Sequence, residues 1–110
     1  MAKRAREKVK DIDDPRKEIF AALACGRRLQ IIELLKEGEK CASDLIPILD
    51  IDQSAVSRHL SILKKAGILT SHKEGVNVYY RIANQKVFDL LSIATEIIKE
   101  RSKEVIKKLK

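Results

Sequence analysis

The sequence predicts a mainly helical domain that carries a two-stranded β wing, the arrangement of a winged helix-turn-helix. Three observations support this fold class. Apolar residues recur at helical spacing in four consecutive segments between Asp14 and Gly67. The pattern then changes to the alternation typical of strands between Ile68 and Ile82. A long apolar stripe follows Asn84 and predicts a long final helix.

The first two helices are marked by their ends. Asp14 is a suitable N-cap, and Pro15 suits the first helical position because it needs no N–H there. A break is expected at Cys25-Gly26, and Gly38 is a natural end for the second helix. Residues 1–13 form a predicted basic N-terminal arm, for which a solvated tail is the simpler interpretation, and 14–110 form the predicted folded domain.

The next two helices are short and closely spaced. The interval from Cys41 to Asp44 has the spacing of a capping box, with Cys in place of Ser or Thr. Pro47 lies inside that helix, and we expect strain or distortion there. After a tight turn at 50–51, Asp52 is the predicted N-cap of a helix over Asp52–Ala66.

The wing and the final helix complete the predicted order. Strands are expected over 69–73 and 76–82, with Glu74-Gly75 as the hairpin tip. Asn84 is the predicted cap of the final helix, whose apolar stripe runs from Val87 to Leu109. That stripe suits a dimer interface, because so long a helix would overhang a small domain, although packing within one subunit is the alternative.

Composition limits the classes of protein. The chain has 110 residues, 45% of them apolar and 35% charged, which is typical of one globular domain. Its net charge of +7 favours a polyanionic partner, although ordinary solubility charge explains the same value. There is no apolar run long enough to cross a bilayer and no apolar signal core at the charged N-terminus, so a cytoplasmic protein is expected.

The pair of helices joined by a tight turn is the mechanical core of a helix-turn-helix, in which the second helix enters the major groove of DNA. Gln53 can bond adenine, Arg58 can bond guanine or a phosphate, and Ser57 is short enough to allow close approach. The simpler alternative is an amphipathic helix whose polar face meets water, but a wing follows at once and favours DNA. The predicted DNA contacts are Gln53, Ser54, Ser57, Arg58, His59 and Ser61, with Lys64, Lys65, His72 and Lys73 as flanking phosphate contacts. Glu74 at the wing tip argues against deep insertion of the wing.

The run from Phe20 to Ile82 resembles the ArsR/SmtB family of dimeric repressors, most specifically in the segment DQSAVSRHLSILKKAGIL. The resemblance covers about residues 17 to 98. It implies a homodimer joined through the first and last helices, a double-stranded operator with inverted half-sites, and release from DNA when an inducer binds.

The resemblance also implies two possible metal sites, and at both of them this chain lacks some of the usual metal ligands. The matching positions on the final helix are Asn84, Lys86, Ile97 and Glu100, three of which are not usual zinc ligands, so no zinc site is expected there. The second site uses a Cys-x-Cys pair, but this chain has Cys41-Ala42-Ser43. Thiophilic ions prefer two or three thiolates.

Cys25 and Cys41 are the two thiols of the chain, and each lies at a predicted helix N-terminus, where a thiolate is favoured. Both could be small buried residues without special chemistry. The alternatives are a redox-responsive thiol or a soft metal or metalloid site. No other cofactor is expected.

The sequence leaves more than one function open. A sequence-specific repressor is favoured, and an architectural or inducer-independent winged-helix nucleic-acid-binding protein is the alternative. A pure dimerisation module is disfavoured by the polar residues retained on the predicted reading helix. An enzyme is not expected, because the sequence has no Gly-rich phosphate loop and no convincing set of catalytic groups.

Overall fold

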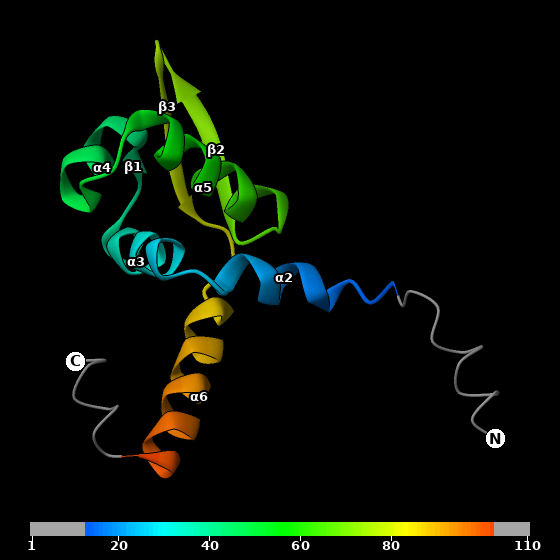
Figure 1. The fold of residues 1–110 in the computed structure, drawn as a ribbon. Coiled ribbons are helices and arrows are strands. Elements are labelled where there is room, and N and C mark those ends of the chain that lie inside the picture. The colour runs from blue at the N-terminus through cyan, green and yellow to red at the C-terminus, as the bar shows by residue number, and fades with distance from the viewer. Residues whose placement is uncertain (1–12, 103–110) are drawn as a thin grey trace.

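The computed structural model describes residues 13–102 and follows the predicted order of elements (Figure 1). The helices are α2 (Arg16–Leu23), α3 (Gly26–Leu34), the 3₁₀ turn η1 (Leu35–Glu37), α4 (Ala42–Leu49), α5 (Gln53–Lys65) and α6 (Lys86–Arg101). The strands are β1 (Lys40–Cys41), β2 (Leu69–Glu74) and β3 (Asn77–Ile82). This order confirms the winged helix-turn-helix. The predicted arm over 1–13 and the end of the final apolar stripe, with Val105 and Leu109, lie almost wholly outside the described residues.

Short polar side chains begin the helices where the sequence places them. The Asp14 carboxylate accepts the backbone N–H of Arg16 at 3.0 Å, and Pro15 has helical dihedrals. Asp52 accepts the N–H of Ala55 at 2.8 Å at the start of α5, and Asn84 accepts the N–H of Lys86 at 2.9 Å. Each bond satisfies a donor that the first helical turn cannot pair internally.

The turn between α4 and α5 sets the orientation of the two helices of the helix-turn-helix. Asp50 has left-handed dihedrals, with φ of 56°, and its N–H bonds to the carbonyl of Ile46 at 2.9 Å. The Arg27 guanidinium donates to the carbonyl of Leu49 at 2.6 Å, which satisfies an orphan acceptor at the end of α4. The helix continues through Pro47 to Leu49 as one element.

The wing is part of a three-stranded antiparallel sheet in the order β1-β3-β2. Its tip lies at Gly75 and Val76, one residue beyond the predicted position, because Glu74 pairs with Asn77 at the end of the ladder. The prediction of two strands was incomplete. Lys40 and Cys41 form a third strand that pairs with Tyr80 and Tyr79. Two residues are too few to show the alternation that signals a strand.

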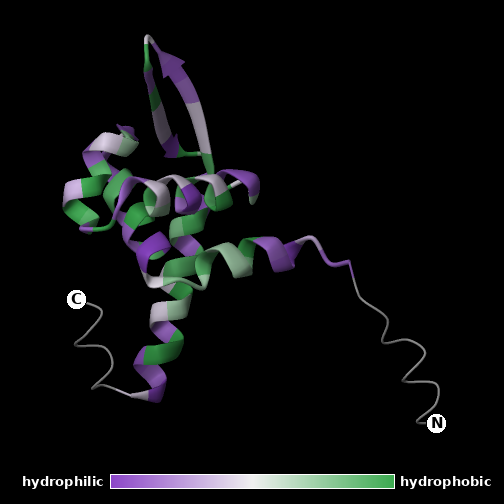
Figure 2. Cartoon of the chain, turned by 45° about the horizontal axis from the view of Figure 1, so that its top comes forward, coloured by the Kyte–Doolittle hydropathy of each residue, from purple (hydrophilic) through white to green (hydrophobic). Residues whose placement is uncertain are grey.

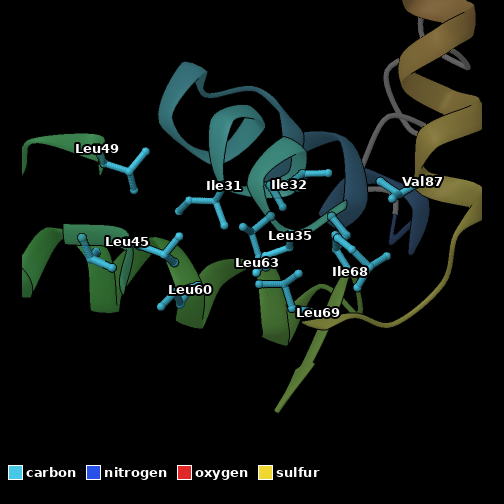
Figure 3. Packing of buried hydrophobic residues seen from close by; sticks show 13 residues of the cluster. Ile31, Ile32, Leu35, Leu45, Leu49, Leu60, Leu63, Ile68, Leu69 and Val87 are labelled. Atoms are coloured by element: carbon cyan, nitrogen blue, oxygen red, sulfur yellow. The ribbon is translucent and has the colours of Figure 1, made fainter. Parts of the chain in front are cut away.

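The core lies between α3, α4 and α5 and continues to the base of the sheet. Figure 3 shows Ile31 and Ile32 of α3 in one cluster with Leu60 and Leu63 of α5, and all four side chains are fully buried. Val87 joins this cluster from the first turn of α6. The core therefore holds α5 by one face and leaves its other face to solvent.

Beyond Val87, α6 extends away from the other helices (Figure 1), and hydrophobic residues continue along it (Figure 2). Ile93 is 56% exposed and Ile97 is 63% exposed. Together with Leu90 they follow the spacing of one helix face, which lies uncovered in the single chain. Within residues 13–102, no helix is both apolar enough and long enough to span a membrane.

Candidate nucleic-acid interface

The reading surface is the solvent-facing side of α5. Val56, Leu60 and Leu63 are fully buried, so the opposite side of the helix points away from the core. The polar side chains predicted to contact DNA are exposed there or along its edges: Gln53, Ser54, Ser57, Arg58, Ser61, Lys64 and Lys65. Residues 53–65 include no acidic side chain, so this surface carries only positive charge. Such a surface suits the major groove, which offers base acceptors beside phosphates.

The end of α5 also fits this role. Gly67 has φ of 84°, a conformation that side chains with a Cβ rarely adopt, and it donates to the carbonyl of Lys64. Ile68 then bonds to the carbonyl of Leu63 at 3.0 Å. The chain thereby turns at once into β2, which fixes the wing against the end of the reading helix.

His59 is half-buried, unlike the exposed side chains of this surface, and its contact with DNA stays a prediction. It follows Arg58 by one residue, and this step rotates it by about 100° around the helix. The structure places it half-buried, with Nδ1 at 3.1 Å from Nη1 of Arg28 on α3. This nitrogen is therefore engaged within the protein, and His59 is not grouped with the exposed side chains of α5.

His72 and Lys73 lie on β2 of the wing. Lys73 is exposed, as a phosphate contact requires. His72 lies between two carboxylates, with Nδ1 at 3.6 Å from Glu39 and Nε2 at 3.4 Å from Glu74, and its ring stacks on Tyr79. The two carboxylates reduce the positive potential that a phosphate would meet at this point.

Comparison with known proteins decides the class. Residues 25–71 match the family described as "Bacterial regulatory protein, arsR family". The chain is 36% identical over 99 residues to the cadmium resistance transcriptional regulatory protein CadC of Listeria innocua, and the match covers 88% of this chain and 83% of that protein. The chain belongs to the ArsR family. Its function is therefore in DNA-binding transcription regulation and not in catalysis.

Two further ArsR-family matches agree. The transcriptional repressor SmtB of Mycobacterium tuberculosis is 39% identical over 75 residues, which cover 68% of this chain and 56% of that one. A homodimeric winged helix-turn-helix DNA-binding domain from Mycobacterium bovis superposes with a TM-score of 0.70 at 31% identity. That match covers 84% of this chain and 91% of the other.

The two thiols of this ArsR-family chain have different surroundings. Cys25 is half-buried at the N-terminus of α3, where the backbone N–H of Arg28, against the opposing effect of burial, lowers the pKa of the thiol. The N–H of Arg27 and the charges of both arginines act in the same direction. Cys41 is buried, and its sulfur lies 3.0 Å from the Ser43 hydroxyl.

Asp44 completes the predicted capping box. Its carboxylate accepts the backbone N–H of Cys41 at 3.0 Å, which lowers the pKa of Asp44. The Cys41 thiol also donates to this carboxylate at 3.3 Å. In the part of the chain that the structure describes, no three His, Cys, Asp or Glu side chains are grouped to hold a metal ion.

Proposed function

We propose that this protein is a cytoplasmic transcriptional repressor that binds a double-stranded operator with inverted half-sites as a homodimer. The observation that carries the proposal is the exposed side of α5, which combines short polar side chains with Arg58. The opposite side of α5 packs into the hydrophobic core, which fixes the position of the helix. Relatives named as repressors support the direction of regulation.

The homodimer rests on apolar surface that a single chain leaves uncovered. Phe20 on α2 is 57% exposed, and Ile93 and Ile97 on α6 are exposed to a similar extent. A groove of about 440 Å³ joins these two helices, lined by Ile19 from α2 and by Leu90 and Ile93 from α6. Burying this surface against a second copy would stabilise both subunits. The homodimeric domain from Mycobacterium bovis has the same fold and supports this assembly.

Selection from a random duplex library tests the proposed function. A dimeric repressor enriches a site with two-fold symmetry, whose half-sites are one or more helical turns apart. An architectural protein binds the library without enriching any sequence. Failure to enrich a symmetric site at low and physiological salt would therefore favour the architectural alternative, because phosphate contacts alone still give binding.

For the signal, we propose that Cys25 is the reactive thiol and that Cys41 is structural. The N–H groups of Arg27 and Arg28 favour the Cys25 thiolate, whereas Cys41 is buried and bonded to Ser43 and Asp44. At pH 7 we expect iodoacetamide to alkylate the Cys41→Ser variant, which retains Cys25, faster than it alkylates glutathione. The Cys25→Ser variant should react more slowly than glutathione. Equal rates for both variants would contradict this assignment.

Release of DNA gives a separate test of thiol sensing. A variant without cysteines should bind the operator and no longer respond to oxidants or to soft metals. If it still leaves the operator with every soft metal tested, the signal is not read by Cys25 or Cys41.

A further inference from the structure

Arg28 joins three elements through one guanidinium group. Its Nε donates to the carbonyl of Ala22 at 2.7 Å, and its Nη2 donates to the carbonyl of Ala21 at 3.3 Å. These carbonyls belong to the last turn of α2, and that of Ala21 also accepts the backbone N–H of Ala24 at 3.3 Å. The remaining nitrogen, Nη1, lies 3.1 Å from Nδ1 of His59 on α5. Arg28 therefore connects the C-terminal end of α2 to the reading helix.

The hydrogen bond from Arg28 determines the protonation state of His59. A guanidinium group has only donors, so Nδ1 of His59 must accept this hydrogen bond. An imidazole that accepts at Nδ1 is neutral and carries its proton on Nε2. A second proton would remove the acceptor and place a positive charge beside Arg28. The contact therefore exists only while His59 is neutral.

We propose that His59 is a positioning residue that holds α5 against Arg28, and that its protonation releases this attachment and weakens sequence-specific DNA binding. The inference rests on the proposed function and adds regulation by pH of the same DNA-binding surface. His59 acts through the placement of Arg58 and its neighbours, not by touching DNA.

The charges around His59 give the direction of the effect. The groups that act on it are Arg28 and Arg27 from α3 and Arg58 from its own helix, and all three are cations. At this junction α2 supplies the two carbonyls that Arg28 already binds. Burial, followed by the charge of Arg28, lowers the pKa of His59 below its ordinary value. The neutral form therefore prevails at neutral pH, and the contact is lost only on acidification below about pH 6.5.

The coupling between proton release and DNA binding sets how strongly the specific affinity depends on pH. If specific binding requires neutral His59, each subunit must release one proton to bind once the pH lies below the pKa of this residue. The affinity per subunit then falls by at most about tenfold for each further pH unit. Non-specific binding should not fall, because protonation adds a positive charge to the helix that carries the DNA-binding surface. The ratio of specific to non-specific affinity is the quantity that reports on positioning.

The experiment measures this ratio between pH 7.5 and pH 5.0 at fixed salt, with the selected operator and a scrambled duplex. The wild-type ratio should fall on acidification. The His59→Gln variant, whose amide oxygen can still accept from Arg28, should keep a ratio that changes little with pH. The His72→Gln variant removes the other histidine of the chain. Loss of a predicted phosphate contact should weaken its binding to both duplexes, but its ratio should still fall on acidification.

The outcomes separate this inference from the proposed function. Absence of sequence-specific binding by the wild type at pH 7.5 contradicts the proposed function itself. Specific binding with the same pH profile in wild type and His59→Gln overturns only the positioning role. If His59→Gln does not fold, calorimetry of the wild type at pH 5.5, in buffers of different ionisation enthalpy, should detect proton release on specific binding. No release, or the same release on scrambled DNA, overturns the inference.

Discussion

Replacing Ile93 and Ile97 together by glutamate should convert the dimer into monomers and reduce operator affinity by about 100-fold or more. Both side chains are more than half exposed in the single chain, so the substitutions should leave the subunit folded. In the proposed dimer they would bury unpaired carboxylates, which is strongly unfavourable. Loss of the second subunit removes the gain of a linked second half-site, which is about 10² to 10⁴ in affinity. Light scattering after gel filtration and operator anisotropy measure the two effects.

The matched control places negative charge on another side of the same helix. Ser92→Glu with Lys99→Glu changes the net charge at least as much, at two exposed positions away from the apolar face of α6. This variant should remain dimeric and bind the operator with a far smaller loss. If the Ile93 and Ile97 variant also stays dimeric at micromolar concentration, α6 is not the interface.

Replacing Arg58 by alanine should have the largest effect of any single change on the reading surface. Its side chain is exposed in the N-terminal half of α5, where helix-turn-helix proteins approach base edges. Loss of a bidentate contact to guanine costs about 1–3 kcal/mol for the correct site and relaxes specificity at that position. Titration of wild type and variant on the selected operator, and on duplexes with single base changes, measures both effects.

Arg101→Ala is the control for charge in that series. It removes the same charge from an exposed position at the far end of α6, and it should leave base preference unchanged. A loss for Arg58→Ala that is equal on all duplexes would make Arg58 a phosphate contact. No loss on any duplex would contradict its place in the interface.

The sequence predicted the helix N-termini that depend on hydrogen bonds between residues close together in the chain. Asp14, Asp52 and Asn84 each lie before a helix and bond to its first turn, so three N-termini could be placed within a residue or two. The exposed side of α5 was also predictable, because Val56, Leu60 and Leu63 mark the opposite side by their spacing.

Contacts between distant parts of the chain were not predictable. Sequence spacing placed His59 beside Arg58, and only the packing of α3 on α5 brings Arg28 to its ring, 31 residues away. The strand β1 was missed for a related reason, because Lys40 and Cys41 become a strand only through pairing with Tyr79 and Tyr80. Secondary structure that depends on a remote partner leaves little local signal in two residues.

The third strand divides the wing into two mechanical parts. At Tyr79 and Tyr80, midway along its length, β3 is paired on both sides, whereas towards Lys73 and Glu74 it is paired only with β2. An isolated two-stranded hairpin is marginal in water, so stiffness should decline from this point to Val76, which is 94% exposed. Insertions between Gly75 and Val76 should therefore be tolerated, and the tip offers a place for a fluorescent label that leaves the reading helix undisturbed.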